Sequence, residues 1–146
     1  MKQLTLCGSL LAIVGAAIGF TTSAAAVSAI YRKTTQGITL PTGDNVSLII
    51  HRVTVPAGPR VINYSVTAVN YYTGEFVRCG LRANGSFLEQ HTAVVGGGSS
   101  ATNVATISGV AYTNYSAPYT LDLVCSHDGS GNSVPTIDPY AELAVF

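Results

Sequence analysis

Charged residues are scarce in this sequence. They make up 10% of its 146 residues, and the seven Lys plus Arg balance the seven Asp plus Glu, so the formal net charge is zero. A chain with so little charge has no long-range field to attract nucleic acid or an anionic membrane surface. We therefore expect neither nucleic acid nor a membrane among the partners of the mature chain.

The sequence also lacks the clustered groups that mark most catalytic sites. His51, His91 and His127 are scattered along the chain, and no two cysteines have C-x-x-C spacing. A Ser-His-Asp triad depends on convergence in space, which spacing alone does not show. We therefore expect no enzyme and no catalytic residue. The alternative is a small secreted hydrolase, which requires Asp122 and His127 to share one pocket with a serine.

One segment has oxygen ligands at alternating positions, as in a calcium loop, and runs from Asp128 to Asn132. An EF-hand loop has Gly at its sixth position and Glu at its twelfth, where this sequence has Ser133 and Pro139. Residues 96–100 are rich in Gly but lack the Lys and the following helix of a phosphate-binding loop. We expect neither a metal nor another cofactor, and we interpret both segments as turns or connections.

The N-terminus has the parts of a secretion signal. A positive start is followed by an apolar run at residues 9–20, and Ala24 and Ala26 match the A-x-A pattern of a cleavage site. The apolar run is shorter than the roughly 20 residues that a membrane-spanning helix needs. We predict that residues 1–26 are removed on export, and that residues 27–146 form a single secreted, extracellular domain.

The chain has three cysteines, of which Cys7 lies within the predicted signal. Cys79 and Cys125 are then the only cysteines of the exported protein, and one disulfide is the default for such a pair in an oxidising compartment. Both lie in alternating segments, on the side that also carries the apolar residues. We therefore predict a disulfide between Cys79 and Cys125.

Three segments alternate between apolar and polar residues with the period of a half-buried strand. They cover residues 62–68, 75–82 and 119–126. Other β-rich segments surround them, separated by Gly, Pro, Asn and Ser at intervals of about 8 to 12 residues. No sustained helical period follows the signal. The pattern predicts an all-β fold, an antiparallel β-sandwich of jelly-roll type with about seven to eight strands and one disulfide.

Two turns can be predicted from their residues. Residues 83–86, Ala-Asn-Gly-Ser, place Asn-Gly between two alternating segments, which indicates a hairpin. Residues 56–59, Pro-Ala-Gly-Pro, cannot continue a ladder of backbone hydrogen bonds because proline has no N–H. We expect a tight turn at residues 56–59, before the strand at residues 62–68.

Several short motifs together resemble a known group of proteins. They are Val-Pro-Ala-Gly at residues 55–58, Cys-Gly-Leu-Arg-Ala-Asn-Gly at residues 79–85, a strand ending in Cys125, and Ala-Glu-Leu-Ala-Val-Phe at residues 141–146. The chain resembles small secreted actinobacterial proteins, whose function is mostly unassigned. More distantly, it resembles the jelly-roll heads of the complement C1q and tumour necrosis factor class. This resemblance implies a jelly roll used for binding and a homo-oligomer, often a trimer.

Tyrosine is concentrated in two segments. The chain has eight tyrosines and no tryptophan, and five of the eight fall in residues 70–74 and 112–119. Binding residues concentrate on the loops of a rigid sandwich. If the two segments meet at one end of the sandwich, their rings and amides would suit a polysaccharide or a protein partner. The candidate binding residues are Asn70, Tyr71, Tyr72, Asn114 and Tyr115.

The function expected from the sequence is a secreted, non-catalytic binding or surface-structural module whose partner is an extracellular glycan or protein. A structural alternative exists for the tyrosines. At strand ends they can cap the core with their rings while their hydroxyls stay in water.

Overall fold

The computed structural model of the chain describes residues 28–43, 46–97, 103–129 and 134–146. The predicted signal, residues 1–26, lies outside the described residues. Within the described ranges no helix is long and apolar enough to cross a membrane. The strands are β1 (Ile30–Lys33), β2 (Ile38–Thr39), β3 (Leu48–Val55), β4 (Gly58–Val69), β5 (Glu75–Ala83), β6 (Ser86–Val95), β7 (Val104–Tyr115), β8 (Tyr119–His127), β9 (Thr136–Ile137) and β10 (Glu142–Val145).

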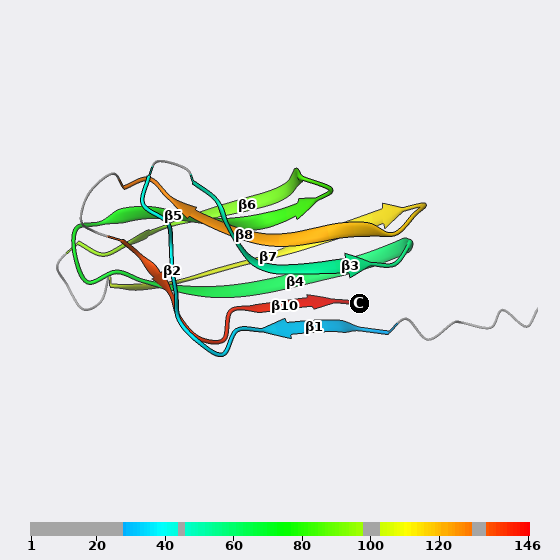
Figure 1. Cartoon of the computed structure of the whole chain (residues 1–146), viewed down its shortest axis with the longest axis horizontal. Helices are drawn as coiled ribbons and strands as arrows, with labels where there is room; N and C mark the ends of the chain where they lie inside the picture. Colours follow the sequence, from blue (N-terminus) through cyan, green and yellow to red (C-terminus); the bar gives the residue numbers. More distant parts are fainter. Residues whose placement is uncertain (1–27, 44–45, 98–102, 130–133) are drawn as a thin grey trace, which may run out of the picture.

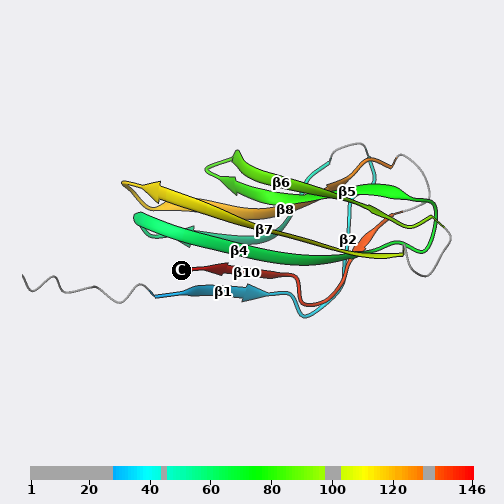
Figure 2. The same ribbon diagram turned by 180° about the vertical axis from the view of Figure 1, so that it is seen from behind.

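Two antiparallel sheets pack against each other (Figure 1, Figure 2). One sheet contains β1, β10, β4 and β7 in that order, and the other contains β3, β8, β5 and β6. The short strands β2 and β9 extend the first sheet beside one end of β4. The chain crosses between the sheets at β2 to β3, β3 to β4, β4 to β5, β6 to β7, β7 to β8 and β8 to β9, which is the topology of a jelly roll. The predicted fold class is confirmed.

The alternating residues of each strand place one face toward a shared core. On β4, Ile62, Tyr64, Val66 and Ala68 are buried, and the residues between them are more exposed. This is the half-buried period that the sequence predicts. The core receives side chains from both sheets and from the segments near β2, β9 and β10. The largest fully buried side chains include Leu40, Ile62, Leu81, Leu121, Leu123, Ile137 and Leu143.

The predicted disulfide is confirmed. Cys79 on β5 lies directly opposite Cys125 on β8, their Cα atoms are 4.2 Å apart, and the two sulfurs are bonded inside the core. Tyr64 reaches across from the other sheet and donates its hydroxyl to the Cys79 carbonyl oxygen at 3.1 Å. Burial raises the pKa of the Tyr64 hydroxyl above its ordinary value, with a smaller contribution from the Glu89 carboxylate. A covalent bond within one sheet and a hydrogen bond between sheets therefore meet at the centre.

The hairpin predicted at residues 83–86 is confirmed. Asn84 and Gly85 form its two-residue turn, and both have positive φ, 49° and 86°. Two successive positive φ values characterise the type I′ turn, which Asn-Gly favours because both residues tolerate that conformation. The Asn84 side-chain oxygen also accepts the backbone N–H of Thr120 at 3.0 Å. The hairpin is thereby attached to the start of β8.

The turn expected at residues 56–59 is wrong in its extent, because β4 already begins at Gly58. Pro59 lies within the strand and pairs with Asn114 of β7. Val61 donates its backbone N–H to Phe146, which follows β10. The nitrogen of Pro59, two residues earlier, faces the same side as that of Val61, where β10 does not extend. A proline at this position therefore removes no ladder hydrogen bond.

Candidate functional site

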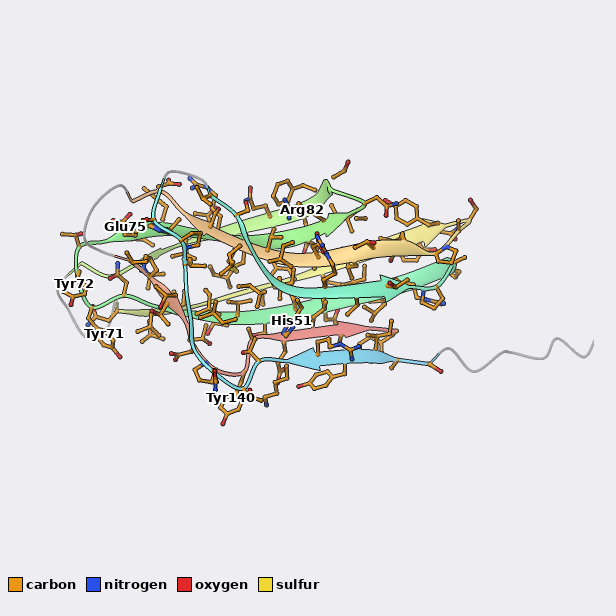
Figure 3. The ribbon with its side chains drawn as sticks, in the orientation of Figure 1. His51, Tyr71, Tyr72, Glu75, Arg82 and Tyr140 are labelled. Carbon is orange, nitrogen blue, oxygen red and sulfur yellow. A yellow bond between two sulfur atoms is a disulfide. The ribbon has the colours of Figure 1, made fainter. Side chains whose placement is uncertain are left out.

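The loop between β4 and β5, residues 70–74, carries the two most exposed tyrosines of the described chain. Tyr71 is 72% exposed and Tyr72 is 67% exposed. Figure 3 shows both side chains at one end of the sandwich, where β4 ends and β5 begins. Exposed aromatic side chains on a sandwich loop are available to contact a ligand. We define Tyr71 and Tyr72 as the tyrosine pair.

Asn70 fixes the shape of this loop. Its side chain is buried, and its Nδ2 donates to the carbonyl oxygens of Thr73 at 2.9 Å and Val95 at 3.3 Å. Its Oδ1 accepts the backbone N–H of Tyr72 at 3.1 Å, which is the hydrogen bond of an Asx turn. The sequence predicted Asn70 as a ligand-contacting residue. That role is corrected here, because its amide is directed into the loop and not toward solvent.

A second contact holds the loop from the other side. Gly97 donates its backbone N–H to the Tyr72 carbonyl oxygen at 2.9 Å. Gly96 has a φ of 100°, and a Cβ atom there would lie 2.8 Å from the Thr73 carbonyl oxygen. Only glycine allows this conformation and this close approach. The backbone beneath the tyrosine pair is therefore packed tightly against the end of β6.

Two depressions adjoin the tyrosine pair. One has a volume of about 240 Å³ and is also lined by Thr136 and Asp138, which lie in and just after β9. The other has a volume of about 400 Å³ and is also lined by Gly97. Tyr71 and Tyr72 line both depressions. One pair of rings can therefore contact a ligand that occupies either depression or extends across both.

Sequence reasoning did not find Thr136 and Asp138. They are more than 60 positions from the tyrosine pair and belong to no recognisable motif. They reach the site because β9 pairs with the last residues of β4, and because Asp138 donates its backbone N–H to the Thr67 carbonyl oxygen at 2.8 Å. Only the order of the strands in the sheet shows this proximity.

Asn114 and Tyr115 lie at the opposite end of the sandwich, so the expectation that the two tyrosine segments meet is wrong. In the register of β4 with β7, Tyr115 pairs with Gly58, and Val104 pairs with Val69 beside the tyrosine pair. Twelve residues of strand separate the two ends, a distance of roughly 35 Å. Tyr115 is half-buried, and its ring centroid is 4.5 Å from that of Tyr119. This arrangement matches the structural alternative, in which a tyrosine caps the core.

The alternative hydrolase site around Asp122 and His127 does not form. The two residues are five positions apart on β8, and side chains at an odd offset leave opposite faces of a strand. Asp122 is paired in bidentate fashion with Arg52, at 2.7 and 2.9 Å. His127 is fully buried, with its Nε2 2.9 Å from the Pro41 carbonyl oxygen and its Nδ1 accepting the backbone N–H of Gly129 at 3.1 Å. Both groups stabilise the fold.

The calcium-like segment is only partly described. Asp128 forms an ion pair with Arg78, so its carboxylate is directed toward a guanidinium. Residues 130–133 lie outside the described residues. Among the His, Cys, Asp and Glu of the described ranges, no group of three has the arrangement of a metal site.

No protein-family model matches the chain, and no curated protein matches it in sequence. Among solved structures, the chain is similar to a chain in the structure of the infectious bursal disease virus Gx strain, with a TM-score of 0.58 and 10% identity. The similarity covers 81% of this chain and 32% of the viral chain. The chain is also similar to the VP2 subviral particle of that virus, with a TM-score of 0.54 and 14% identity over 81% and 32%. The chain thus spans about a third of each viral chain.

The likeness to the viral structures shows a shared jelly-roll fold. A fainter likeness, with a TM-score of 0.44 and 16% identity over 90% of this chain and 86% of that chain, is to a structure described as "EclA C-terminal domain; sugar-binding protein". A likeness of that size supports no functional assignment. The resemblance to small actinobacterial proteins and to C1q and tumour necrosis factor heads stays a prediction.

Proposed function

We propose that this protein is a non-catalytic extracellular binding module, and that its tyrosine pair binds a neutral polysaccharide. One observation carries the proposal. Two adjacent tyrosines, each about two-thirds exposed or more, stand on a fixed loop and line two depressions. Binding residues concentrate on loops held by a rigid scaffold, and contiguous exposed apolar surface often marks a binding site.

The chemistry of the lining residues favours a sugar. Tyrosine rings offer flat apolar faces that pack against the C–H groups of a pyranose, and their hydroxyls can donate or accept hydrogen bonds. Thr136 and Asp138 line the same depression, and a hydroxyl and a carboxylate can both accept hydrogen bonds from sugar hydroxyls. A carboxylate at this position repels acidic sugars, so the expected ligand is a neutral glycan.

The fixed loop also supports a binding role. Ordering a flexible loop on ligand binding costs free energy for each side chain and backbone segment that becomes immobile. Here Asn70 and the Gly96–Gly97 contact already hold the loop backbone in the free protein. Most of that cost is therefore met in folding, and a weak sugar–aromatic contact can contribute to net affinity.

The disulfide supports an extracellular location. A buried, fully formed disulfide such as Cys79–Cys125 is typical of proteins that fold in an oxidising compartment and rare in the cytosol. It agrees with the secretion signal predicted at residues 1–26.

The proposal is tested by affinity electrophoresis through gels that contain neutral polysaccharides, among them xylan, β-glucan, mannan and a soluble, neutral chitin derivative. The wild-type protein should be retarded by at least one of them. Tyr72→Ala and Tyr71→Ala should each weaken binding by about tenfold, because each removes one stacking face. Tyr140→Ala is the matched control, since Tyr140 is 64% exposed and Figure 3 places it away from the tyrosine pair.

Circular dichroism and a free-thiol assay should show that every variant keeps its fold and its disulfide. Equal retardation of the wild type and both tyrosine-pair variants would reject the site. If no polysaccharide retards the wild type, while a protein partner is captured in a manner that requires Tyr71 and Tyr72, the glycan assignment is wrong and the loop is a protein-binding site.

A further inference from the structure

The solvent-facing side of β4 and β7 carries no charged residue. The outward positions are the odd-numbered residues of β4 from Pro59 to Thr67 and the even-numbered residues of β7 from Val104 to Asn114. The two strands are paired over their whole length, so these positions form one continuous strip. An exposed sheet face and an edge strand such as β7 ordinarily carry charges, often Lys, which prevent association with other chains. Their absence from the whole strip requires an explanation.

The same strip presents large apolar side chains to solvent. Val61, Val110 and Tyr112 are all exposed, and the register places Val61 directly beside Tyr112. On the neighbouring strands, Phe146 pairs with Val61, and Tyr31 projects from β1 in the same row as Val110. The five side chains therefore lie in two adjacent rows of one face, a loose cluster in which Ala144 and Asn63 separate Tyr31 from Val110. We call the outer side of β1, β10, β4 and β7 around this cluster the apolar face.

The charges nearest to the cluster lie on β1 and β10, in the row of Ser65 and Ser108. Lys33 on β1 and Glu142 on β10 form an ion pair at 3.3 Å, and Tyr31 donates its hydroxyl to the Glu142 carboxylate at 2.7 Å. An uncharged, aromatic centre with a polar rim is the composition of a protein–protein interface. The uncharged polar residues of the strip, which are Ser, Thr and Asn, can be buried against a partner at far lower cost than a charge.

The size of the apolar face also fits a protein partner. At half to two-thirds exposure, Tyr31, Tyr112 and Phe146 alone present about 350 Å² of surface. The two twelve-residue strands and the two four-residue strands cover roughly 500 Å² in outline, from the spacing between strands and the rise per residue. Weak interfaces bury less than about 1,200 Å² over both partners, so this area fits a weak one.

We propose that the apolar face is a self-association surface, on which a second copy of this chain packs sheet against sheet. An isologous dimer needs one patch that complements itself under a two-fold rotation. The apolar face offers such a pattern, since the large Phe146 lies next to Ala144 on one edge and Tyr112 next to Val110 on the other. A two-fold axis across the strands between these rows sets each aromatic ring of one copy over the smaller Ala144 or Val110 of the other. The centre of this surface at Val61 is eight positions along β4 from Val69, a distance of roughly 26 Å from the end that carries the tyrosine pair, and the proposal does not depend on the glycan proposal.

The test is sedimentation equilibrium of the purified exported protein at concentrations up to about 100 µM, which covers the micromolar affinity of weak interfaces of this area. The wild type should show a monomer–dimer equilibrium. Val110→Lys places a charge near the centre of the apolar face and should weaken dimerisation by about tenfold or more. Ser108→Arg, in the next row of the same strand, should have the same effect.

Val94→Lys is the matched control, because Val94 is 55% exposed on β6 of the other sheet, while Val110 is 66% exposed. It introduces the same charge on the edge strand of the other sheet and should leave dimerisation unchanged. Circular dichroism should show a folded protein in all cases. A wild type that remains monomeric at the highest concentration would overturn the proposal, and so would a Val110→Lys variant that associates as strongly as the wild type. A dimer disrupted by Val94→Lys alone would place the interface on the other sheet.

Discussion

Removal of the Cys79–Cys125 disulfide should lower the free energy of unfolding by about 4 kcal/mol. The two cysteines are 46 positions apart, and the loop-closure entropy for a loop of that length, −2.1 − 1.5R ln n cal/mol/K, gives about 4 kcal/mol near 25 °C. The bond restricts the conformations of the unfolded chain, because it keeps the segments of β5 and β8 close together. Total stabilities of domains are about 5 to 15 kcal/mol, so the loss is a large fraction.

The perturbation can be made in two ways that separate loop closure from packing. Reduction of the wild-type protein with a phosphine leaves both side chains in the core and removes only the bond. The double variant Cys79→Ala, Cys125→Ala also removes two buried sulfurs, and so adds the cost of small cavities. Guanidinium titrations of the three forms, followed by circular dichroism, give the free energies. In a thermal scan, the reduced protein should unfold about 15 °C below the oxidised one.

The reasoning predicts that most of the loss already appears on reduction. A reduced wild type that is within about 1 kcal/mol of the oxidised protein would refute the loop-closure argument. A double variant that is much less stable than the reduced wild type would show that the sulfur atoms matter chiefly through packing.

Three other predictions concern single side chains. Gly80→Ala should lower stability by about 1 to 3 kcal/mol in denaturant titrations, because its Cβ would clash with the Glu89 carbonyl oxygen of β6. An unchanged midpoint would contradict this close approach. Asp122→Asn should lower the free energy of unfolding by about 1 to 2 kcal/mol by the same measurement, because it weakens the ion pair between a buried carboxylate and the largely exposed Arg52. An unchanged free energy of unfolding would show that the pair is dispensable. The hydrogen bond from Tyr31, and then the Lys33 ammonium, hold the pKa of Glu142 below its ordinary value of 4.5. The stabilising contribution of Glu142 is therefore complete above pH 4.5 and is lost as the pH falls through the lower pKa of the folded state, and an NMR titration midpoint at or above 4.5 would contradict it.

The local features of the fold could be predicted because they depend on residues close together in sequence. The alternation at residues 62–68 sets which side chains of β4 face the core, and a strand has no other way to bury that set. The matching parity of Cys79 and Cys125 predicted a disulfide, and Asn84-Gly85 predicted a hairpin. The turn before β4 was predicted too long, because whether Pro59 removes a hydrogen bond depends on a neighbouring strand that the sequence does not show.

The location of the candidate site depended on the tertiary structure. The period of a strand sets which face a side chain occupies, but the strand order and direction decide which end it reaches. The antiparallel pairing of β4 with β7 therefore places Tyr115 at the opposite end from Tyr71 and Tyr72, although both segments contain the same residue types. The same sheet brings Asp138 beside the tyrosine pair and makes one face from Val61 and Tyr112. Contacts of this kind join residues distant in sequence, and they follow from burial of the whole core and not from any local pattern.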